Sequence, residues 1–220
     1  MPVAFDAYGT LFDVHAAVAA HAHRIGPKAD QFSAVWRERQ LQYSWVHGLA
    51  SAFVPFDVLT ERALDFASAA VAPISPDLRR DLLASYQELN AYAEVPEIIA
   101  QLNAAGVRRC ILSNGTQGMI AAATKAAGLT GAFDALLTAD QIQRYKTDPA
   151  IYAMVTDHFE VAAADVTLCS SNRWDIAGAR QFGFRTIWVN RAGVPNEYPD
   201  LQPDHCVADL TAAVQIILNR

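Results

Sequence analysis

A chain of 220 residues with 52% hydrophobic and 18% charged residues has the composition of a compact globular protein, which excludes a disordered chain. This length is enough for one core of ordinary size with a smaller subdomain attached. The formal net charge of −6 at pH 7 provides no general attraction for polyanions, so we expect neither nucleic acid nor anionic membranes as partners.

Cysteine usage and the N-terminus indicate the compartment. Cys110, Cys169 and Cys206 cannot all pair within one chain, and we expect reduced, structural thiols. The N-terminus lacks the basic flank and apolar stretch of a secretion signal, and no apolar run approaches the length of a membrane span. These features predict a soluble, cytoplasmic protein.

The first predicted element is a buried strand from Val3 to Phe5, which ends at Asp6 and is followed by the turn residues Gly9 and Thr10. From about residue 14 to 92 the apolar spacing is helical instead. Glycine and proline residues break this stretch into four predicted helices, at 14–25, 31–49, 58–71 and 77–91.

After Pro96 helices and strands alternate. The predicted helices are 96–105, 117–127, 149–158, 174–182 and 209–218, and the predicted strands are 107–112, 134–137, 166–169, 185–189 and 205–207. Such alternation predicts a parallel sheet with helices on both faces. We therefore predict an α/β fold, a Rossmann-like doubly wound core of residues 1–13 and 93–220, with an inserted helical cap at 14–92.

Polar residues gather at the predicted strand ends, where ligands bind in open sheets of this type. They are Asp6, the pair Ser113 and Asn114, the run Ser170, Ser171 and Asn172, and Asp175 shortly after, joined by Lys146 from a loop. Each alone has an ordinary explanation, such as a helix cap, a turn or a solvated charge. Their occurrence at successive strand ends favours one shared active site.

Five segments carry a family resemblance over essentially the whole chain. They are Phe5-Asp6-Ala7-Tyr8-Gly9-Thr10-Leu11-Phe12-Asp13, Trp36-Arg37 with Gln40-Leu41, Leu112-Ser113-Asn114-Gly115, Tyr145-Lys146 with Asp148-Pro149 and Tyr152, and Ser170-Ser171-Asn172 with Trp174-Asp175. In these segments the chain resembles the L-2-haloacid dehalogenases of the haloacid dehalogenase superfamily. The resemblance implies an (S)-2-haloacid dehalogenase, which hydrolyses small L-2-haloalkanoic acids to 2-hydroxy acids and halide.

The commonest members of this superfamily are magnesium-dependent phosphatases, which carry a second Asp two residues after the nucleophile as a general acid. Tyr8 stands at that position here and cannot protonate a leaving alkoxide as a carboxylic acid does, whereas a departing halide needs no proton. Ser170, Ser171 and Asn172 occupy the loop where phosphatases place acidic ligands, which leaves Asp175 alone. We therefore expect a site without metal or cofactor.

The resemblance implies a role for each catalytic residue. Asp6 attacks C2 of the substrate, expels halide with inversion, and leaves an ester that water hydrolyses. We expect Lys146 to keep Asp6 ionised, because a nearby cation favours the charged form of a carboxylate. Asp175 and Asn172 would position and activate the water, while Thr10 and Ser170 would support the loops.

The substrate contacts follow from the same resemblance. Ser113 would bind the substrate carboxylate, and Arg37 from the cap would receive the halide together with Asn114. The remaining residues expected at the substrate are Tyr8, Leu41, Phe56, Tyr152 and Trp174. Core packing explains Leu41 and Phe56 equally well, and a surface ion pair is the alternative for Arg37.

Other functions stay open at this point. A phosphatase for a small phosphate ester is the main alternative, followed by a hydrolase that uses Asp6 on another C2 electrophile, such as a strained ring. A binding module that has lost turnover comes from a different class, although it would have no use for the set of residues around Asp6. The preferred halogen is not indicated, and a homodimer is expected by analogy with the family.

Overall fold

The computed structural model describes residues 1–219, in which six strands form one sheet in the order β3-β2-β1-β4-β5-β6. The strands are β1 (Val3–Phe5), β2 (Arg109–Ser113), β3 (Ala135–Thr138), β4 (Thr167–Ser170), β5 (Arg185–Val189) and β6 (His205–Val207). All neighbouring strands are parallel, and the central strands β1, β2 and β4 are buried along their whole length. Their continuous apolar runs fit strands that are covered on both faces.

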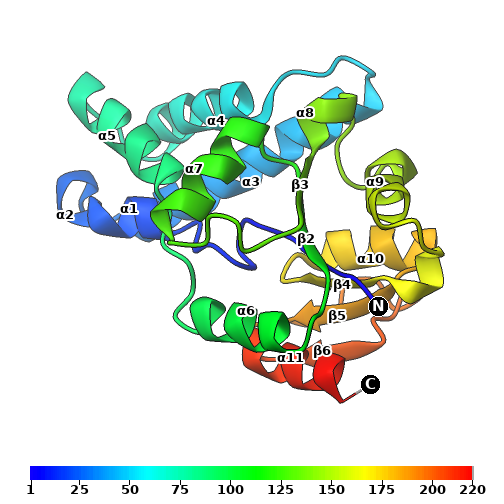
Figure 1. Cartoon of the computed structure of the whole chain (residues 1–220). Helices are drawn as coiled ribbons and strands as arrows, with labels where there is room; N and C mark the ends of the chain where they lie inside the picture. The colour runs from blue at the N-terminus through cyan, green and yellow to red at the C-terminus, as the bar shows by residue number, and fades with distance from the viewer. Residues whose placement is uncertain (220) are drawn as a thin grey trace.

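Helices cover both faces of this sheet. They are α6 (Val95–Ala104), α7 (Gln117–Ala126), α8 (Ala139–Ile142), α9 (Pro149–Phe159), α10 (Arg173–Phe182), α11 (Leu210–Leu218) and the short 3-10 helix η1 (Ala163–Asp165). Helices α6 and α11 contact each other on one side of the sheet, and α9 and α10 contact each other on the other side (Figure 1). The predicted doubly wound α/β fold is therefore confirmed.

Five helices lie between β1 and α6 and gather at one end of the molecule (Figure 1). They are α1 (Ala16–Ala20), α2 (Ala22–Ile25), α3 (Ala29–Leu49), α4 (Phe56–Ala70) and α5 (Pro76–Gln87). We refer to residues 14–92 as the cap, and their separation as a domain stays a prediction. One continuous cluster of buried apolar side chains runs from the sheet into the cap, for example from Phe5 to Phe32.

The chain enters and leaves the cap through adjacent segments. The backbone N–H of Asp13 donates to the carbonyl of Asn90 (3.0 Å), and that of Tyr92 donates to the carbonyl of Leu11 (2.9 Å). The first of these segments follows directly after Asp6. The loop that follows Asp6 and the two cap connections are thus parts of one hydrogen-bonded unit.

Some predicted boundaries differ from the structure. The single helix predicted at 14–25 is split into α1 and α2 at His21, whose ring hydrogen-bonds Ser85 of α5 (3.0 Å). Strands β2 and β4 extend one residue further than predicted, to Ser113 and Ser170. Among residues 1–219, no helix combines the length and the apolar character needed to cross a membrane.

Candidate active site

The carboxylate of Asp6 lies at the carboxyl end of the central strand β1 and receives four hydrogen bonds. Its Oδ1 accepts from Nζ of Lys146 (3.0 Å). Its Oδ2 accepts from Nδ2 of Asn172 (2.7 Å), and from the hydroxyls of Thr10 (3.0 Å) and Ser170 (3.3 Å). Asp6 is only 5% exposed, so these donors hold its carboxylate in one orientation.

Lys146 is a fully buried cation between two carboxylates. Its Nζ lies 3.0 Å from Asp6 Oδ1 and 2.7 Å from Asp175 Oδ2. Burial alone would lower the pKa of Lys146, but the charges of Asp175 and Asp6 outweigh burial and raise its pKa above the usual value. Its backbone N–H also donates to Oδ1 of Asn114 (2.8 Å), which joins this loop to the end of β2.

Asp175 lies in the first turn of α10 and has no exposed surface. Burial raises the pKa of Asp175 above its usual value, and the charge of Lys146 opposes this effect only in part. The hydroxyl of Tyr152 donates to Oδ1 of Asp175 (2.9 Å) and also lies 3.2 Å from its carbonyl oxygen. A buried carboxylate with a raised pKa is suited to accept a proton.

The supporting loops are joined by their own hydroxyl groups. Thr10 Oγ1 accepts from the backbone N–H of Ser171 (2.8 Å), and Ser170 Oγ accepts from that of Asn172 (3.1 Å). The amide of Asn172 also donates to the carbonyl of Tyr8 (3.1 Å). The loops after β1 and β4 are therefore fixed to each other around Asp6.

The residues around Asp6 and Asp175 do not fit a divalent cation. The Lys146 ammonium occupies the space between the two carboxylates, and its charge would repel a metal ion placed there. In the described part of the chain, no group of three or more His, Cys, Asp or Glu side chains is arranged to hold a metal ion. The positive charge of this site is therefore supplied by the chain itself.

Arg37 approaches the site from cap helix α3. Its guanidinium donates to the carbonyl of Tyr8 through Nη2 (3.3 Å) and to Oε1 of Gln40 through Nη1 (2.7 Å). None of the ion pairs among residues 1–219 includes Arg37, and the neighbouring Glu38 is exposed. The structure therefore does not support the alternative of a surface ion pair for this residue.

Two buried donors of candidate substrate-binding residues have no hydrogen-bond partner within residues 1–219, the hydroxyl of Tyr8 and Nδ2 of Asn114. Tyr8 lies between Phe56 and Tyr86, with ring centroids 6.3 and 5.6 Å away. Burial and the neighbouring Tyr86 raise the pKa of Tyr8 well above its usual value, so its hydroxyl keeps its proton. A buried donor without a partner keeps its hydrogen-bonding capacity free for an acceptor.

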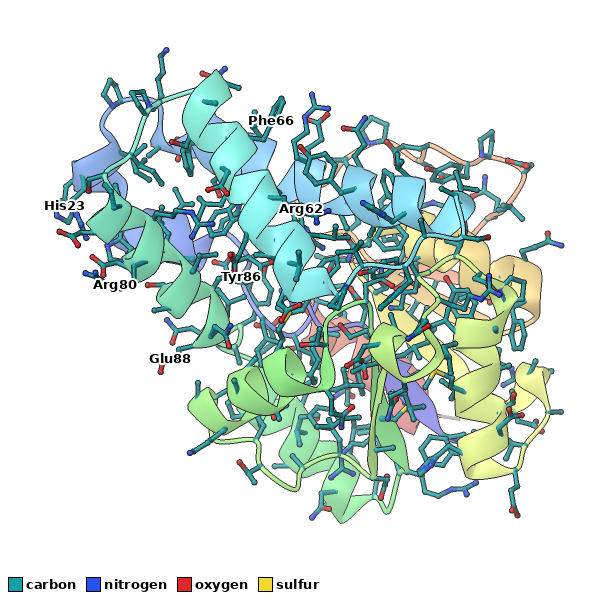
Figure 2. All side chains as sticks on the ribbon, turned by 90° about the horizontal axis from the view of Figure 1, so that it is seen from above. His23, Arg62, Phe66, Arg80, Tyr86 and Glu88 are labelled. Atoms are coloured by element: carbon teal, nitrogen blue, oxygen red, sulfur yellow. The ribbon has the colours of Figure 1, made fainter. Side chains whose placement is uncertain are left out.

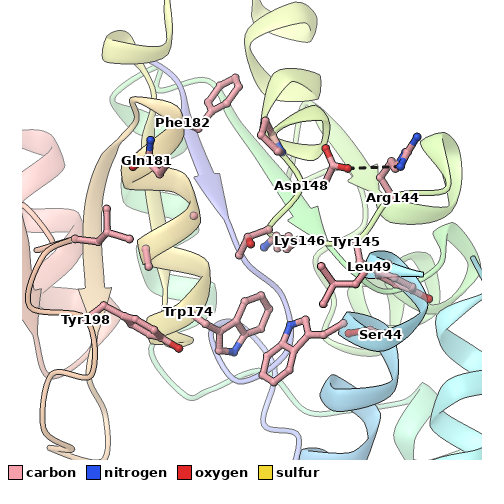
Figure 3. Close-up of a pocket in the computed structure, with 17 residues that line it drawn as sticks. Ser44, Leu49, Arg144, Tyr145, Lys146, Asp148, Trp174, Gln181, Phe182 and Tyr198 are labelled. Carbon is pink, nitrogen blue, oxygen red and sulfur yellow. Dashed lines mark ion pairs between the residues drawn. The ribbon is translucent and has the colours of Figure 1, made fainter. Parts of the chain in front are cut away.

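A pocket of about 840 Å³ adjoins this site from outside. Figure 3 shows Trp174, Lys146 and Tyr145 among the residues that line it. Trp174 meets Trp45 of α3 edge to face, with centroids 5.5 Å apart. Asp6 and Arg37 are not among the residues that line this pocket, and the Lys146 side chain is fully buried. The pocket therefore lies beside the Asp6 carboxylate and does not open onto it.

The structure places most of the remaining candidates near this cluster. Ser113 is fully buried and its Oγ accepts from the N–H of Gly115 (3.0 Å). Leu41 is half-buried on α3, where no hydrogen bond or ring contact connects its side chain to Asp6 within the described residues. Tyr152 differs from the expectation of a substrate contact, because its side chain is fully buried and its hydroxyl is engaged by Asp175.

Sequence reasoning gave no role to Gln40 and did not identify Tyr86, yet both lie against Arg37 or Tyr8. The sequence indicated Gln40 only as a member of the segment Trp36-Arg37 with Gln40-Leu41, one of those that carry the family resemblance. Tyr86 has no sequence signal, since it is one aromatic residue on the apolar face of α5.

Comparison with known proteins agrees with this geometry. The model of the haloacid dehalogenase-like hydrolase family matches residues 3–183. (S)-2-haloacid dehalogenase 1 of Pseudomonas sp. (strain CBS-3) is 42% identical over 98% of this chain and 95% of the relative, and (S)-2-haloacid dehalogenase 4A of Burkholderia cepacia is 42% identical over 94% and 90%.

Two crystal structures of dehalogenases are also similar. One, of a dehalogenase with an intermediate complex, superposes with a TM-score of 0.95 at 40% identity, covering 98% of this chain and 96% of the other. The L-2-haloacid dehalogenase from Xanthobacter autotrophicus with covalently bound chloropropionic acid gives 0.86 at 30% identity, covering 98% and 97%. From these matches and the family model, the chain belongs to the haloacid dehalogenase-like hydrolases and, within them, to the (S)-2-haloacid dehalogenase family.

Proposed function

We propose that this enzyme hydrolyses the carbon–halogen bond of small (S)-2-haloalkanoic acids, through an ester on Asp6 and without a metal ion. The observation that carries the proposal is the buried Lys146 ammonium between Asp6 and Asp175. It supplies the positive charge at the place where a phosphatase of this superfamily would need a divalent cation. The names of the relatives, which include several (S)-2-haloacid dehalogenases, support the same substrate class.

In the first half-reaction, a carboxylate oxygen of Asp6 attacks C2 of the substrate. The new C–O bond forms as the carbon–halogen bond breaks, and the halide leaves with the bonding electrons. Attack from the side opposite the halide inverts the configuration at C2. The hydrogen bonds to Asp6 contribute by holding the attacking oxygen in a fixed direction, which lowers the entropic part of the barrier.

The substrate carboxylate and the halide would take different donors. Ser113 Oγ already accepts a hydrogen bond from Gly115, so its proton is available for the substrate carboxylate. Negative charge develops on the departing halide, and Arg37 and Asn114 would receive it. The Tyr8 hydroxyl, which has no partner among the described residues, provides a further donor nearby.

In the second half-reaction, water attacks the carbonyl carbon of the Asp6 ester. Asp175 would accept the proton of this water, for which its raised pKa is suited. The Asn172 amide and the Lys146 ammonium would stabilise the negative charge on the ester oxygen. The ester bond then breaks, the proton taken up by Asp175 passes to the departing oxygen, and a 2-hydroxy acid is released whose hydroxyl oxygen comes from Asp6. We assign Tyr152 to positioning Asp175, because its hydroxyl holds that carboxylate.

Phosphoryl transfer fits these residues less well. Tyr8 provides no carboxylic acid to protonate an alkoxide, and burial raises its pKa well above the usual value. Opening of another C2 electrophile, such as a strained ring, would use the same Asp6 chemistry. Only activity tests with such substrates distinguish it from dehalogenation. A homodimeric state and a cytoplasmic location also stay predictions.

The test is halide release by purified, EDTA-treated enzyme from the two enantiomers of 2-chloropropionate and from chloroacetate and fluoroacetate. Phosphate release from p-nitrophenyl phosphate with Mg²⁺ is measured in parallel, and Asp6→Asn serves as the inactive control. We expect halide from the S enantiomer despite EDTA. Phosphate release without halide would instead establish the phosphatase alternative, and silence in both assays would favour another electrophile or a binding module.

A further inference from the structure

Gln40 lies one helical turn after Arg37 on α3 and is almost completely buried, at 1% exposure. Its Oε1 accepts from Nη1 of Arg37 (2.7 Å) and from the hydroxyl of Tyr86 (3.0 Å). Its Nε2 donates to Oγ1 of Thr60 on α4 (2.6 Å). The amide therefore joins three cap helices, α3, α4 and α5, at the point where the guanidinium is held.

The orientation of this amide is dictated by its neighbours. The Thr60 hydroxyl has one proton, which it donates to the carbonyl of Phe56 (2.7 Å). Thr60 Oγ1 can then only accept from Gln40, so the NH₂ group of the amide must face Thr60. Its carbonyl oxygen is left facing Arg37 and Tyr86, which are both donors. A reversed amide would place NH₂ against the Arg37 guanidinium, which can only donate, and a carbonyl against the Thr60 oxygen, which has no free proton.

The acceptors that hold Arg37 are neutral. They are the carbonyl oxygen of the Gln40 side chain and the backbone carbonyl of Tyr8, and within residues 1–219 no carboxylate forms an ion pair with this guanidinium. A carboxylate at the same place would offset the charge of Arg37, whereas a carbonyl fixes its direction and leaves the charge available. The guanidinium is thus oriented without being neutralised.

Tyr86 connects the Gln40 amide to Tyr8, one of the residues expected at the substrate. Its ring stacks on Tyr8 (5.6 Å), while its hydroxyl contacts the Gln40 carbonyl. Figure 2 shows Tyr86 toward the interior of the cap, whereas Arg80 and Glu88 lie at its outer edge. The buried Tyr86 hydroxyl therefore has a defined partner, and that partner is the acceptor of Arg37.

We propose that Gln40 is a positioning residue for the leaving halide: its carbonyl, oriented by Thr60 and shared with Tyr86, aims the uncompensated charge of Arg37 at the halogen. This inference rests on the proposed function, because it takes Arg37 as a halide acceptor. A purely structural role in the cap would lower activity toward every leaving group in the same proportion. A role in halide stabilisation affects the poorer leaving group more strongly.

The experiment compares kcat/KM for (S)-2-bromopropionate and (S)-2-chloropropionate, and inhibition by free bromide and chloride, in Gln40→Glu and Tyr86→Phe. Gln40→Glu keeps the shape of the side chain but places a negative charge on Arg37. We expect kcat/KM for the chloro acid to fall about ten- to a hundredfold, the range for one hydrogen bond to a charged group. The bromo acid should lose less, and halide inhibition should weaken by about tenfold or more.

The matched control is Gln42→Glu, the same substitution two residues further on α3, where Gln42 is exposed and pairs with Arg39. It should leave the bromide-to-chloride ratio and halide inhibition unchanged. Tyr86→Phe removes only one hydrogen bond to the Gln40 carbonyl and should shift both quantities in the same direction as Gln40→Glu, by less. This second variant decides the question if Gln40→Glu does not fold.

The outcomes separate this inference from the proposed function. Wild-type enzyme that releases no halide from either acid would overturn the proposed function itself. Normal wild-type dehalogenation, with an unchanged bromide-to-chloride ratio and unchanged halide inhibition in folded Gln40 and Tyr86 variants, would overturn the positioning role alone.

Discussion

In the proposed mechanism, the two sides of the reacting carbon are built in opposite ways. On the nucleophile side, the Lys146 ammonium lies 3.0 Å from Asp6 and 2.7 Å from Asp175, and the other partners of Asp6 come from the end of β4 and the loops after β1 and β4. On the leaving-group side, Arg37 comes from a cap helix and is held by neutral acceptors. Two buried donors there have no partner in the described residues, the Tyr8 hydroxyl and the Asn114 amide.

This difference indicates what each side must do. The nucleophile has to stay in one place through both half-reactions, so all of its hydrogen bonds are formed before substrate arrives. The leaving-group side has to receive a negative charge that appears only during the reaction. Donors left without acceptors in the protein can stabilise that charge without first breaking bonds elsewhere.

The largest expected effect comes from removing the charge at the centre of the nucleophile side. Lys146→Met leaves two buried carboxylates unpaired, and we expect the free energy of unfolding to fall by about 3–5 kcal/mol. Halide release should fall by about 10²–10³-fold or more, because the lysine also stabilises charge on the Asp6 ester. Urea denaturation and halide assays measure the two quantities, with the exposed Lys125→Met as control.

Part of this loss should return when one carboxylate is also neutralised. In the double variant Lys146→Met with Asp175→Asn, the loss of stability should be smaller than the sum of the two single losses. Additive losses would mean that the three charges are not coupled, which would contradict the account of the nucleophile side.

The next effect tests the leaving-group side through Tyr8. A Cβ added at Gly115 would lie 2.8 Å from Cε2 of Tyr8, so Gly115→Ala must displace the ring that borders the site. We expect kcat/KM to fall about tenfold and stability to fall by about 1–3 kcal/mol. Gly118→Ala is the control, since its nearest neighbour would be 4.0 Å away, and it should keep full activity. Equal activity of the two variants would show that the Tyr8 ring position is unimportant.

A smaller effect concerns the acid limb of the pH profile. Asp175 must be ionised to accept a proton, and its pKa is raised above 3.8 chiefly by burial, so the rate of ester hydrolysis, measured as kcat or in a single turnover, should fall as the pH drops through a value above 3.8. Tyr152→Phe removes a hydrogen bond that favours the ionised form, and the limb should move up by about half to one pH unit. A limb that stays in place or moves to lower pH would argue against Asp175 as the base.

The smallest effect is expected at an exposed ion pair. Arg79 lies 2.6 Å from Asp65 and 3.3 Å from Glu61 on the cap surface, where water screens the charges. Arg79→Ala should change stability by less than about 1 kcal/mol and leave halide release unchanged. A loss comparable to that of Lys146→Met would mean that burial does not explain the difference between the two sites.

The nucleophile side was largely predictable from the sequence. Short apolar runs that end in polar residues marked β1, β2 and β4, and the topology of a parallel sheet brings their carboxyl ends together. The place of Lys146 is less evident, because this residue lies in a loop 140 positions from Asp6. Its place in a loop next to the predicted strand ends suggested the site, and the resemblance to a family supplied its partner Asp6.

The remaining contacts depend on how helices pack, which periodicity alone does not reveal. Tyr152 reaches Asp175 because α9 lies close to α10 at Gly178, where a Cβ would lie 2.5 Å from the Tyr152 hydroxyl. The break between α1 and α2 at His21 accompanies a hydrogen bond to Ser85, which is distant in the sequence. The hydrogen bonds of the Gln40 amide could not be predicted from α3 alone, because their partners Thr60 and Tyr86 come from α4 and α5.

The most direct test of the central claim is a single turnover in H₂¹⁸O, with enzyme in excess over (S)-2-chloropropionate. If water attacks the carbonyl of an Asp6 ester, ¹⁸O enters the enzyme, in the N-terminal tryptic peptide of residues 1–24, and the product hydroxyl carries ¹⁶O. If instead ¹⁸O appears in the product hydroxyl and none in that peptide, water attacks C2 directly, and Asp6 is not the nucleophile.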